Sequence, residues 1–153
     1  MNKLLFVTAL CLIPASAFAD EILTWRHVQH ASIYQSVEVG NITGHTLNVY
    51  RMPGLATFPD GHVATTELAG SSDTANGGGG IQGYLVLHDK EGDLWLKWSG
   101  TVSSDGLRKG TFTAMGGTGR FAGTKGEGTF EGRGTGIGPN AMAYIDNKII
   151  LTK

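Results

Sequence analysis

Glycine dominates residues 110–138, and this stretch restricts the fold more than any other part of the chain. Two Gly-Thr-Phe triplets, at 110–112 and 128–130, flank a Gly-Gly-Thr-Gly segment at 116–119. An interior glycine costs a helix about 1 kcal/mol relative to alanine, so a run this rich in glycine is incompatible with a helix. It suits a strongly coiled sheet, because the missing side chains let strands bend and backbones approach. The stretch therefore predicts two antiparallel strands joined by a tight, glycine-dependent corner.

Residues 1–19 have the pattern of a secretory signal peptide. Lys3 supplies a positive charge, residues 4–13 form an apolar run, and Ala-Phe-Ala at 17–19 is an A-x-A cleavage site. The apolar run is shorter than the roughly 20 residues that a membrane-spanning helix needs, so no stable membrane insertion is expected. We predict cleavage before Asp20 and export to the periplasm or the medium, and the style of the signal favours a Gram-negative bacterium.

The only cysteine, Cys11, lies inside this predicted signal, and Leu10 before it argues against a lipoprotein anchor. Residues 20–153 therefore have no cysteine, which excludes disulfides, thiolate metal sites and a cysteine nucleophile from the mature chain. The length of the segment 20–153 suits one domain with one hydrophobic core. The formal net charge is −1 and no basic stripe stands out, so nucleic acid is not an expected partner.

Alternating apolar and polar residues, broken by turn signals, predict that the rest of the chain is almost entirely strand. Residues 22–25 are expected to form a short lead-in, and the Gly- and Ser-rich residues 70–80 a slack surface loop or a lid. The pattern predicts a single all-β domain over 20–153, an antiparallel up-and-down barrel of about eight strands, just wide enough for side chains or one small ligand. Besides the glycine-rich pair, the expected strands lie near residues 33–39, 46–52, 62–68, 82–88, 93–103 and 141–151.

The segment Gly-Gly-Thr-Gly-Arg-Phe-Ala-Gly at 116–123 resembles one found at a late hairpin of the allene oxide cyclase and dirigent group of small β-barrels. The spacing of the expected strands from 82 to 151 is also similar. The resemblance implies a calycin-like barrel with a hydrophobic cavity, and a homo-oligomer, either a trimer or a dimer. Members of the group cyclise oxylipins, guide phenoxy-radical coupling or catalyse cycloadditions. Their pocket residues, including the dirigent Asp and Arg pairs, have no matching motif here, so the catalytic residues stay unknown.

Two other patterns are weaker. Gly117-x-Gly119-x-x-Ala122 matches a dinucleotide fingerprint, but a strand rather than a helix is expected to follow it. No haem, flavin or nicotinamide signature is present either, so no cofactor is expected. A metal site needs three or four converging ligands, and the scattered histidines give no sign of convergence, so no metal is expected. The histidines are His27, His30, His45, His62 and His88.

Aromatic and acidic residues on the expected strands supply a candidate binding site. Trp98, Phe112 and Phe130 fall at positions that could point inward, either as core or as the lining of an apolar pocket. Tyr34 and Glu67 are candidate polar groups near its mouth, where a glutamate could act as an acid or base. In contrast, Glu127, Glu131 and Arg133 share one strand face, which we expect to be the outer one. The candidate ligand-binding residues are Tyr50, Glu67, Tyr84, Trp98, Phe112 and Phe130.

Three functions fit this sequence. The first is an exported barrel that binds a small hydrophobic molecule in an apolar cavity. The second is a cofactor-independent cyclase or isomerase in the same barrel, which would need at least two polar side chains converging in the cavity. The third is a structural or interaction protein of the cell envelope, which would have a solid core and a large apolar outer patch.

Overall fold

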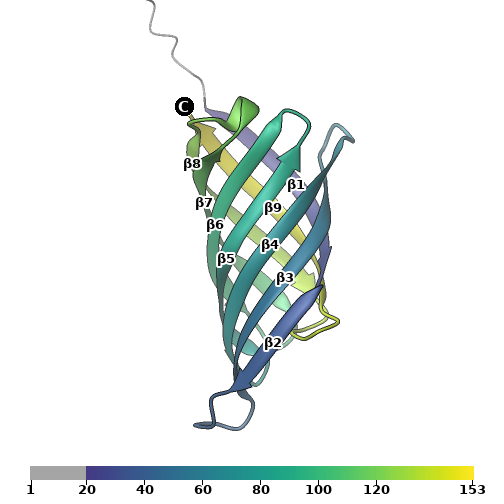
Figure 1. Ribbon diagram of the computed structural model, residues 1–153, viewed down its shortest axis with the longest axis vertical. Coiled ribbons are helices and arrows are strands. Elements are labelled where there is room, and N and C mark those ends of the chain that lie inside the picture. Colours follow the sequence, from purple (N-terminus) through teal and green to yellow (C-terminus); the bar gives the residue numbers. More distant parts are fainter. Residues whose placement is uncertain (1–19) are drawn as a thin grey trace, which may run out of the picture.

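Nine β-strands joined by short connections make up most of residues 20–153, the part of the chain that the computed structural model describes (Figure 1). Neighbouring strands are antiparallel and follow the order β1-β9-β8-β7-β6-β5-β4-β3-β2, and a further β1–β3 pairing closes the sheet into a barrel. The strands are β1 (Glu21–His30), β2 (Ile33–Glu38), β3 (His45–Thr57), β4 (Val63–Ala75), β5 (Gly78–Asp89), β6 (Gly92–Val102), β7 (Leu107–Gly117), β8 (Lys125–Gly134) and β9 (Met142–Thr152). No helix in this part of the chain has the length and apolar character of a membrane span.

The barrel has eight strand positions because β1 and β2 share one of them. β1 pairs with the end of β3 up to Gln29↔Gly54, and β2 continues along the same edge of β3 from Ile33↔Arg51. The register shifts by one residue between the two strands, as at a β-bulge. β9 pairs with β1 and not with β2, so the barrel wall is incomplete beside β2. The predicted all-β, eight-stranded barrel is confirmed.

The expected lead-in at residues 22–25 is instead part of β1, a strand of the barrel wall. Leu23 and Trp25 point inward and are buried, and β1 pairs along its whole length with β9. The sequence of β1 does not alternate cleanly between apolar and polar residues, because the apolar Ile22 faces outward and is exposed. β1 begins at Glu21, directly after the predicted mature N-terminus at Asp20. The predicted signal peptide itself lies outside the described residues.

The prediction of a slack surface loop or a lid at residues 70–80 is also wrong, because β4 and β5 run through this segment. They meet at a two-residue turn, Asn76–Gly77, with φ values of 52° and 80°, which is the geometry of a tight hairpin turn. Gly79 lies on the barrel wall, where a Cβ would come within 2.1 Å of the carbonyl oxygen of Asp73. Glycine here permits close approach of two coiled strands rather than flexibility.

One end of the barrel is filled by buried apolar side chains and capped by the 116–123 segment. This segment joins β7 to β8 through a single 3₁₀ turn, η1 (Gly119–Phe121), and carries the side chain of Phe121 into the barrel end. Because β8 follows η1 directly, the dinucleotide fingerprint lacks the helix that it needs. The predicted glycine-dependent corner is confirmed. The buried residues of this end include Leu23, Trp25, Phe58, Leu87, Leu94, Ala114, Phe121, Ile149 and Leu151.

Exposed apolar side chains gather on the outer face of β1, β2 and β3. Cross-strand pairs such as Val28↔Leu55 and Val37↔Leu47 bring them together. Polar side chains such as Asn48 point inward from the same strands, so the usual pattern is inverted here. The homo-oligomer implied by the resemblance stays a prediction, and this face is where an interface would be sought. The face consists of Val28, Ile33, Val37, Leu47, Val49 and Leu55.

Candidate functional site

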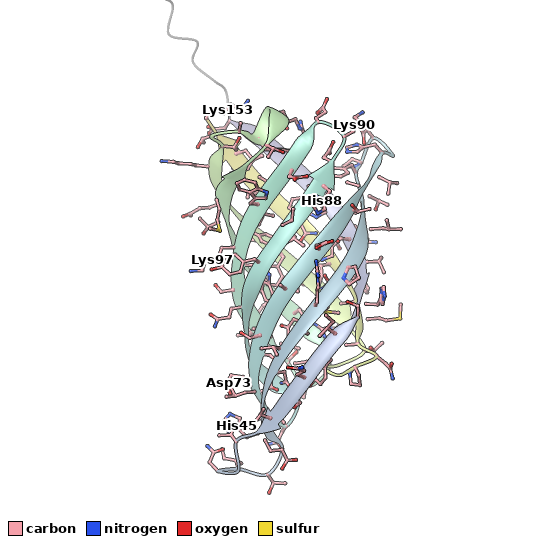
Figure 2. All side chains as sticks on the ribbon, in the orientation of Figure 1. His45, Asp73, His88, Lys90, Lys97 and Lys153 are labelled. Carbon is pink, nitrogen blue, oxygen red and sulfur yellow. The ribbon has the colours of Figure 1, made fainter. Side chains whose placement is uncertain are left out.

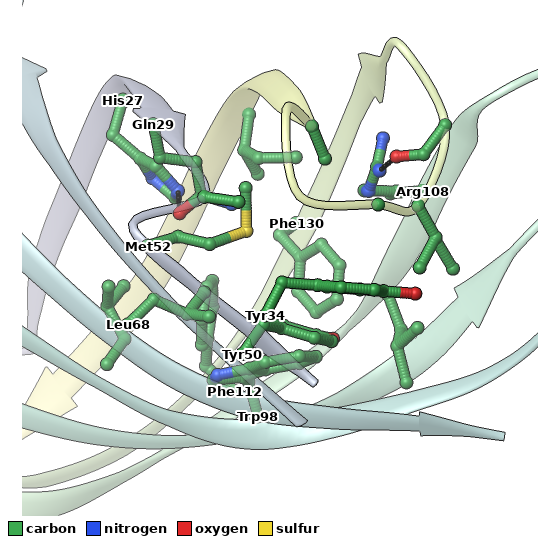
Figure 3. Close-up of a pocket in the computed structure, with 18 residues that line it drawn as sticks. His27, Gln29, Tyr34, Tyr50, Met52, Leu68, Trp98, Arg108, Phe112 and Phe130 are labelled. Atoms are coloured by element: carbon green, nitrogen blue, oxygen red, sulfur yellow. Dashed lines mark hydrogen bonds between the residues drawn. The ribbon is translucent and has the colours of Figure 1, made fainter. Parts of the chain in front are cut away.

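A cavity lies inside the barrel (Figure 3), and none of its lining residues belongs to η1. Its volume is about 50 Å³, counted as the space open to the centre of a water molecule. By that measure a single water needs roughly 10–15 Å³, so the cavity has room for a small guest. Its lining is mostly apolar and includes few polar side chains. It is formed by His27, Gln29, Ala31, Tyr34, Tyr50, Met52, Leu68, Ile81, Leu85, Trp98, Arg108, Phe112, Phe130, Gly136, Ile137, Gly138, Ala141 and Ile145.

Three aromatic rings form one wall of this cavity. Phe130 contacts Trp98 edge-on, with ring centroids 6.1 Å apart, and lies 5.1 Å from Phe112. Glycines on the neighbouring strands make room for these rings. A Cβ at Gly70 would come within 2.7 Å of the Trp98 ring, and one at Gly110 within 2.6 Å of the Phe130 ring. The glycines of the sequence therefore shape the cavity as well as the coiling of the sheet.

Two tyrosines form the side of the cavity nearest β2 and β3. The Tyr50 hydroxyl donates to the backbone oxygen of Ser71 over 3.2 Å, and burial raises the pKa of this phenol, so it stays protonated at neutral pH. The Tyr34 hydroxyl donates to Asn48 Oδ1 over 2.5 Å. Asn48 in turn donates to Ser72 Oγ over 3.0 Å. The hydroxyl groups of both tyrosines thus have protein partners, and their rings contribute apolar surface.

A buried polar group on β1 also lines the cavity. Burial lowers the pKa of His27 to about 4, so the imidazole is neutral at pH 7. Its Nδ1 lies 3.0 Å from the amide nitrogen of Asn147, which can only donate, so Nδ1 accepts and Nε2 carries the proton. Nε2 then donates to Gln29 Oε1 over 3.1 Å. Both imidazole nitrogens are occupied, which leaves His27 without a free site for proton transfer.

Arg108 is the one charged residue that lines the cavity. Its guanidinium donates to the backbone oxygen of Gly106 over 3.2 Å. It also donates to the backbone oxygen of Gly136 over 2.6 Å (Figure 3). The second bond ties Arg108 to the connection between β8 and β9, which runs beside the incomplete part of the wall. Burial lowers the pKa of Arg108 relative to a free arginine. A Cβ at Gly134 would lie 1.9 Å from Nη1, so the guanidinium occupies space that a side chain at this position would take.

The structure brings four of the six candidate residues to the cavity and places two elsewhere. Tyr50, Trp98, Phe112 and Phe130 line it, as does Tyr34. Tyr84 instead faces outward and is 53% exposed, because Leu85 occupies the inward position beside it.

Glu67 also faces outward, where it pairs with Arg51 across β3 and β4. The expectation of a glutamate at the cavity mouth is therefore wrong. As expected, Glu127, Glu131 and Arg133 share the outer face of β8.

Sequence reasoning missed His27, Gln29 and Arg108. A signal was present for Arg108, because it lies two and four residues before Gly110 and Phe112 on the same face of β7. Its position next to a turn, between Leu107 and Lys109, made it resemble an exposed hairpin residue.

The histidines do not converge. His27 points inward from β1, while His30 lies on the exposed face of the same strand. Figure 2 shows His45 and Asp73 together at one end of the barrel and His88 towards the other. Among residues 20–153, no three histidine, cysteine, aspartate or glutamate side chains lie close enough to hold a metal ion. The pairs formed are His45 with Asp73, His62 with Asp60 and Asp89, and His88 with Asp93.

Solved structures share this barrel. The pterocarpan synthase dirigent protein PsPTS1 matches with a TM-score of 0.55 and 13% identity, over 89% of this chain and 96% of that protein. The pterocarpan synthase dirigent protein GePTS1 matches with a TM-score of 0.53 and 13% identity, over 97% and 99%. Pyocyanin demethylase matches with a TM-score of 0.49 and 16% identity, over 83% and 99%. No family model and no curated protein matches the sequence. The chain thus has the dirigent-like barrel fold that its 116–123 segment predicted.

Proposed function

We propose that this barrel binds a small hydrophobic molecule in the cavity of Figure 3. The observation that carries the proposal is an aromatic wall, formed by Trp98, Phe112 and Phe130, around space that the core side chains leave open. A mostly apolar cavity with a few placed polar groups is the usual form of a small-molecule site. Proteins named pterocarpan synthases use the same barrel, which supports a function in the cavity without specifying the ligand.

Toluene binding to residues 20–153, followed by NMR, tests this proposal. The indole N–H of Trp98 is buried without a hydrogen-bond partner and reports on the cavity wall. Toluene is expected to bind, because burial of apolar surface contributes roughly 25 cal/mol for each Å² removed from water. A bound aromatic ring beside the indole should then shift this resonance on titration. Ala141→Leu adds a side chain at the lining and is expected to weaken binding at least tenfold.

Ala69→Leu is the matched control, since Ala69 lies on the exposed face of β4. This variant should bind toluene as the wild type does. The proposal fails if toluene leaves the Trp98 resonance unchanged, or if both variants weaken binding equally.

A cofactor-independent cyclase or isomerase is the second candidate, and one observation favours it: Tyr50, Arg108 and Gln29 converge on one cavity. Cationic Arg108 is a donor with unused N–H groups, so it would stabilise negative charge that develops on a bound substrate. The neutral, fully bonded His27 offers no base. Such an enzyme would act by positioning and electrostatics, and conversion of a bound compound would distinguish it from a carrier.

We also propose that the chain is exported and cleaved before Asp20. The support is the signal pattern of residues 1–19 together with the start of β1 at Glu21, which leaves every strand of the barrel in the mature chain. Intact mass spectrometry of the protein from a periplasmic fraction is expected to give the mass of residues 20–153. A periplasmic species that retains residues 1–19, or a full-length protein confined to the cytoplasm, would contradict this.

A further inference from the structure

We propose that the cavity takes a small hydrophobic acid, and that Arg108 recognises its carboxylate. This inference rests on the proposed function and specifies the ligand's chemistry. It starts from an imbalance in the barrel: a buried cation lines the cavity, and no anion of the described chain accompanies it.

The other arginines show how unusual Arg108 is. Each of the four lies towards the outer surface and forms an ion pair, whereas Arg108 is 8% exposed and forms none. Water would solvate the exposed arginines in any case, so the one that most needs a counter-charge is the one that lacks it. The pairs are Arg26–Asp146, Arg51–Glu67, Arg120–Glu21, Arg120–Glu91 and Arg133–Asp105.

The hydrogen bonds of Arg108 leave part of its guanidinium unused. A guanidinium has five N–H donors, and the described residues accept from Nη1 and Nη2 only through the backbone oxygens of Gly106 and Gly136. Neutral carbonyl groups do not compensate for the several kcal/mol that removing a cation from water costs. Unused donors of a buried cation beside open space are suited to an incoming anion, and a planar carboxylate matches the geometry of a guanidinium.

No acidic group of the described chain can serve as this anion. The cavity lining contains no aspartate or glutamate, and Tyr50 stays protonated. Asp105, on the hairpin next to Arg108, is an exposed residue already bonded to Arg133 and Ser103. The glycine at 134 keeps room for the guanidinium at this position. A bound anionic ligand would therefore supply the counter-charge that Arg108 lacks.

The two ends of the cavity divide the ligand into two parts. Trp98, Phe112 and Phe130 surround space for an apolar body, which we expect to be a single ring or a short branched chain given the cavity's size. Arg108 lies at the side formed by Gly136, so the carboxylate would point towards the connection between β8 and β9 (Figure 3). This arrangement describes a small aromatic or branched aliphatic acid.

Three probes separate the contributions: phenylacetate, the isosteric neutral phenylacetamide, and toluene, each titrated at pH 7 into wild-type residues 20–153. Phenylacetate is expected to bind at least tenfold more tightly than phenylacetamide. Arg108→Gln removes the charge and is expected to bring the two affinities within about threefold of each other. Arg133→Gln, an exposed arginine on β8, is the matched control and should keep the wild-type preference.

The outcomes distinguish this inference from the function on which it rests. Equal binding of phenylacetate and phenylacetamide by the wild type, with toluene also bound, overturns the acid specificity and leaves the hydrophobic site standing. Failure of all three probes to bind overturns both. Retention of the acid preference in a folded Arg108→Gln variant also overturns the assignment to Arg108. The wild-type comparison decides the question even where this variant does not fold.

Discussion

Replacing Phe121 by alanine is expected to lower the free energy of unfolding by about 3–5 kcal/mol, the range for removing a fully buried aromatic ring. Phe121 is 1% exposed and is the side chain that η1 inserts into the barrel end. Its Cβ lies close to the backbone of β7, so a Cβ at Gly117 would come within 2.7 Å of it. This backbone cannot collapse easily into the space that the ring leaves. Urea denaturation at pH 7 measures the change.

Met115→Ala is the control for this variant, because Met115 lies on the outer face of β7 and is 57% exposed. Its effect should stay within about 0.5 kcal/mol, as for most surface substitutions. A loss of less than about 1 kcal/mol for Phe121→Ala would show that η1 does not seal the barrel end. A changed dependence on urea concentration would instead indicate a change in the denatured state or a loss of two-state behaviour.

The second large effect is a fall in stability between pH 7 and pH 4 caused by His27. Burial lowers its folded-state pKa from 6.5 to about 4, so in this window the unfolded chain binds a proton that the folded chain does not. The unfolding free energy must therefore decrease as the pH is lowered below about 6.5, and the loss is complete near pH 4. A shift of this size corresponds to about 3 kcal/mol.

The comparison that isolates this effect is His27→Gln, which removes the titrating ring. The variant should be less stable than the wild type at pH 7, since His27 bonds to both Gln29 and Asn147. Its stability should depend less on pH, so the two curves approach each other towards pH 4. His62, whose pKa is raised by Asp60 and Asp89, acts in the opposite direction but equally in both proteins. Parallel curves from pH 7 to pH 4 would rule out the neutral, buried state of His27.

The fold was largely predictable because turns and glycines leave local signals. The β4–β5 connection shows the limit of that reasoning. The glycines of this segment predict a flexible loop from the sequence alone. In the structure, Gly79 lies in β5, where a Cβ would collide with the backbone of Asp73 on the paired strand β4. A glycine required for close strand approach and a glycine in a slack loop have the same one-letter code, and only the partner strand distinguishes them.

The site was less predictable, because alternation divides a strand into two faces without saying which is inside. In β3 the apolar Leu47 and Val49 face outward, while Asn48 and Tyr50 point inward. A prediction from hydrophobicity alone would exchange the inner and outer faces of this strand. Tyr84 was misplaced for the same reason, since both it and its neighbour Leu85 suit a buried face.

Arg108 was missed because a charged residue beside a turn is usually exposed. Its burial depends on two segments. Gly134 and Gly136, where β8 ends, leave the space and supply one acceptor, and Gly106 in the turn before β7 supplies the other. Nothing in the local sequence around Arg108 indicates that residues 134 and 136 lie beside it. The strand register provides that connection, since β7 pairs with β8 from Leu107↔Arg133 onward.

The most direct test of the central claim, that this barrel binds a small hydrophobic molecule in its cavity, is a crystal structure of residues 20–153 grown with phenylacetate. The claim predicts electron density for one ring between Trp98, Phe112 and Phe130, and the acid specificity adds a carboxylate within hydrogen-bond distance of Arg108. Density at this position that is filled by the protein's own side chains, with phenylacetate absent from the barrel interior, would contradict the claim.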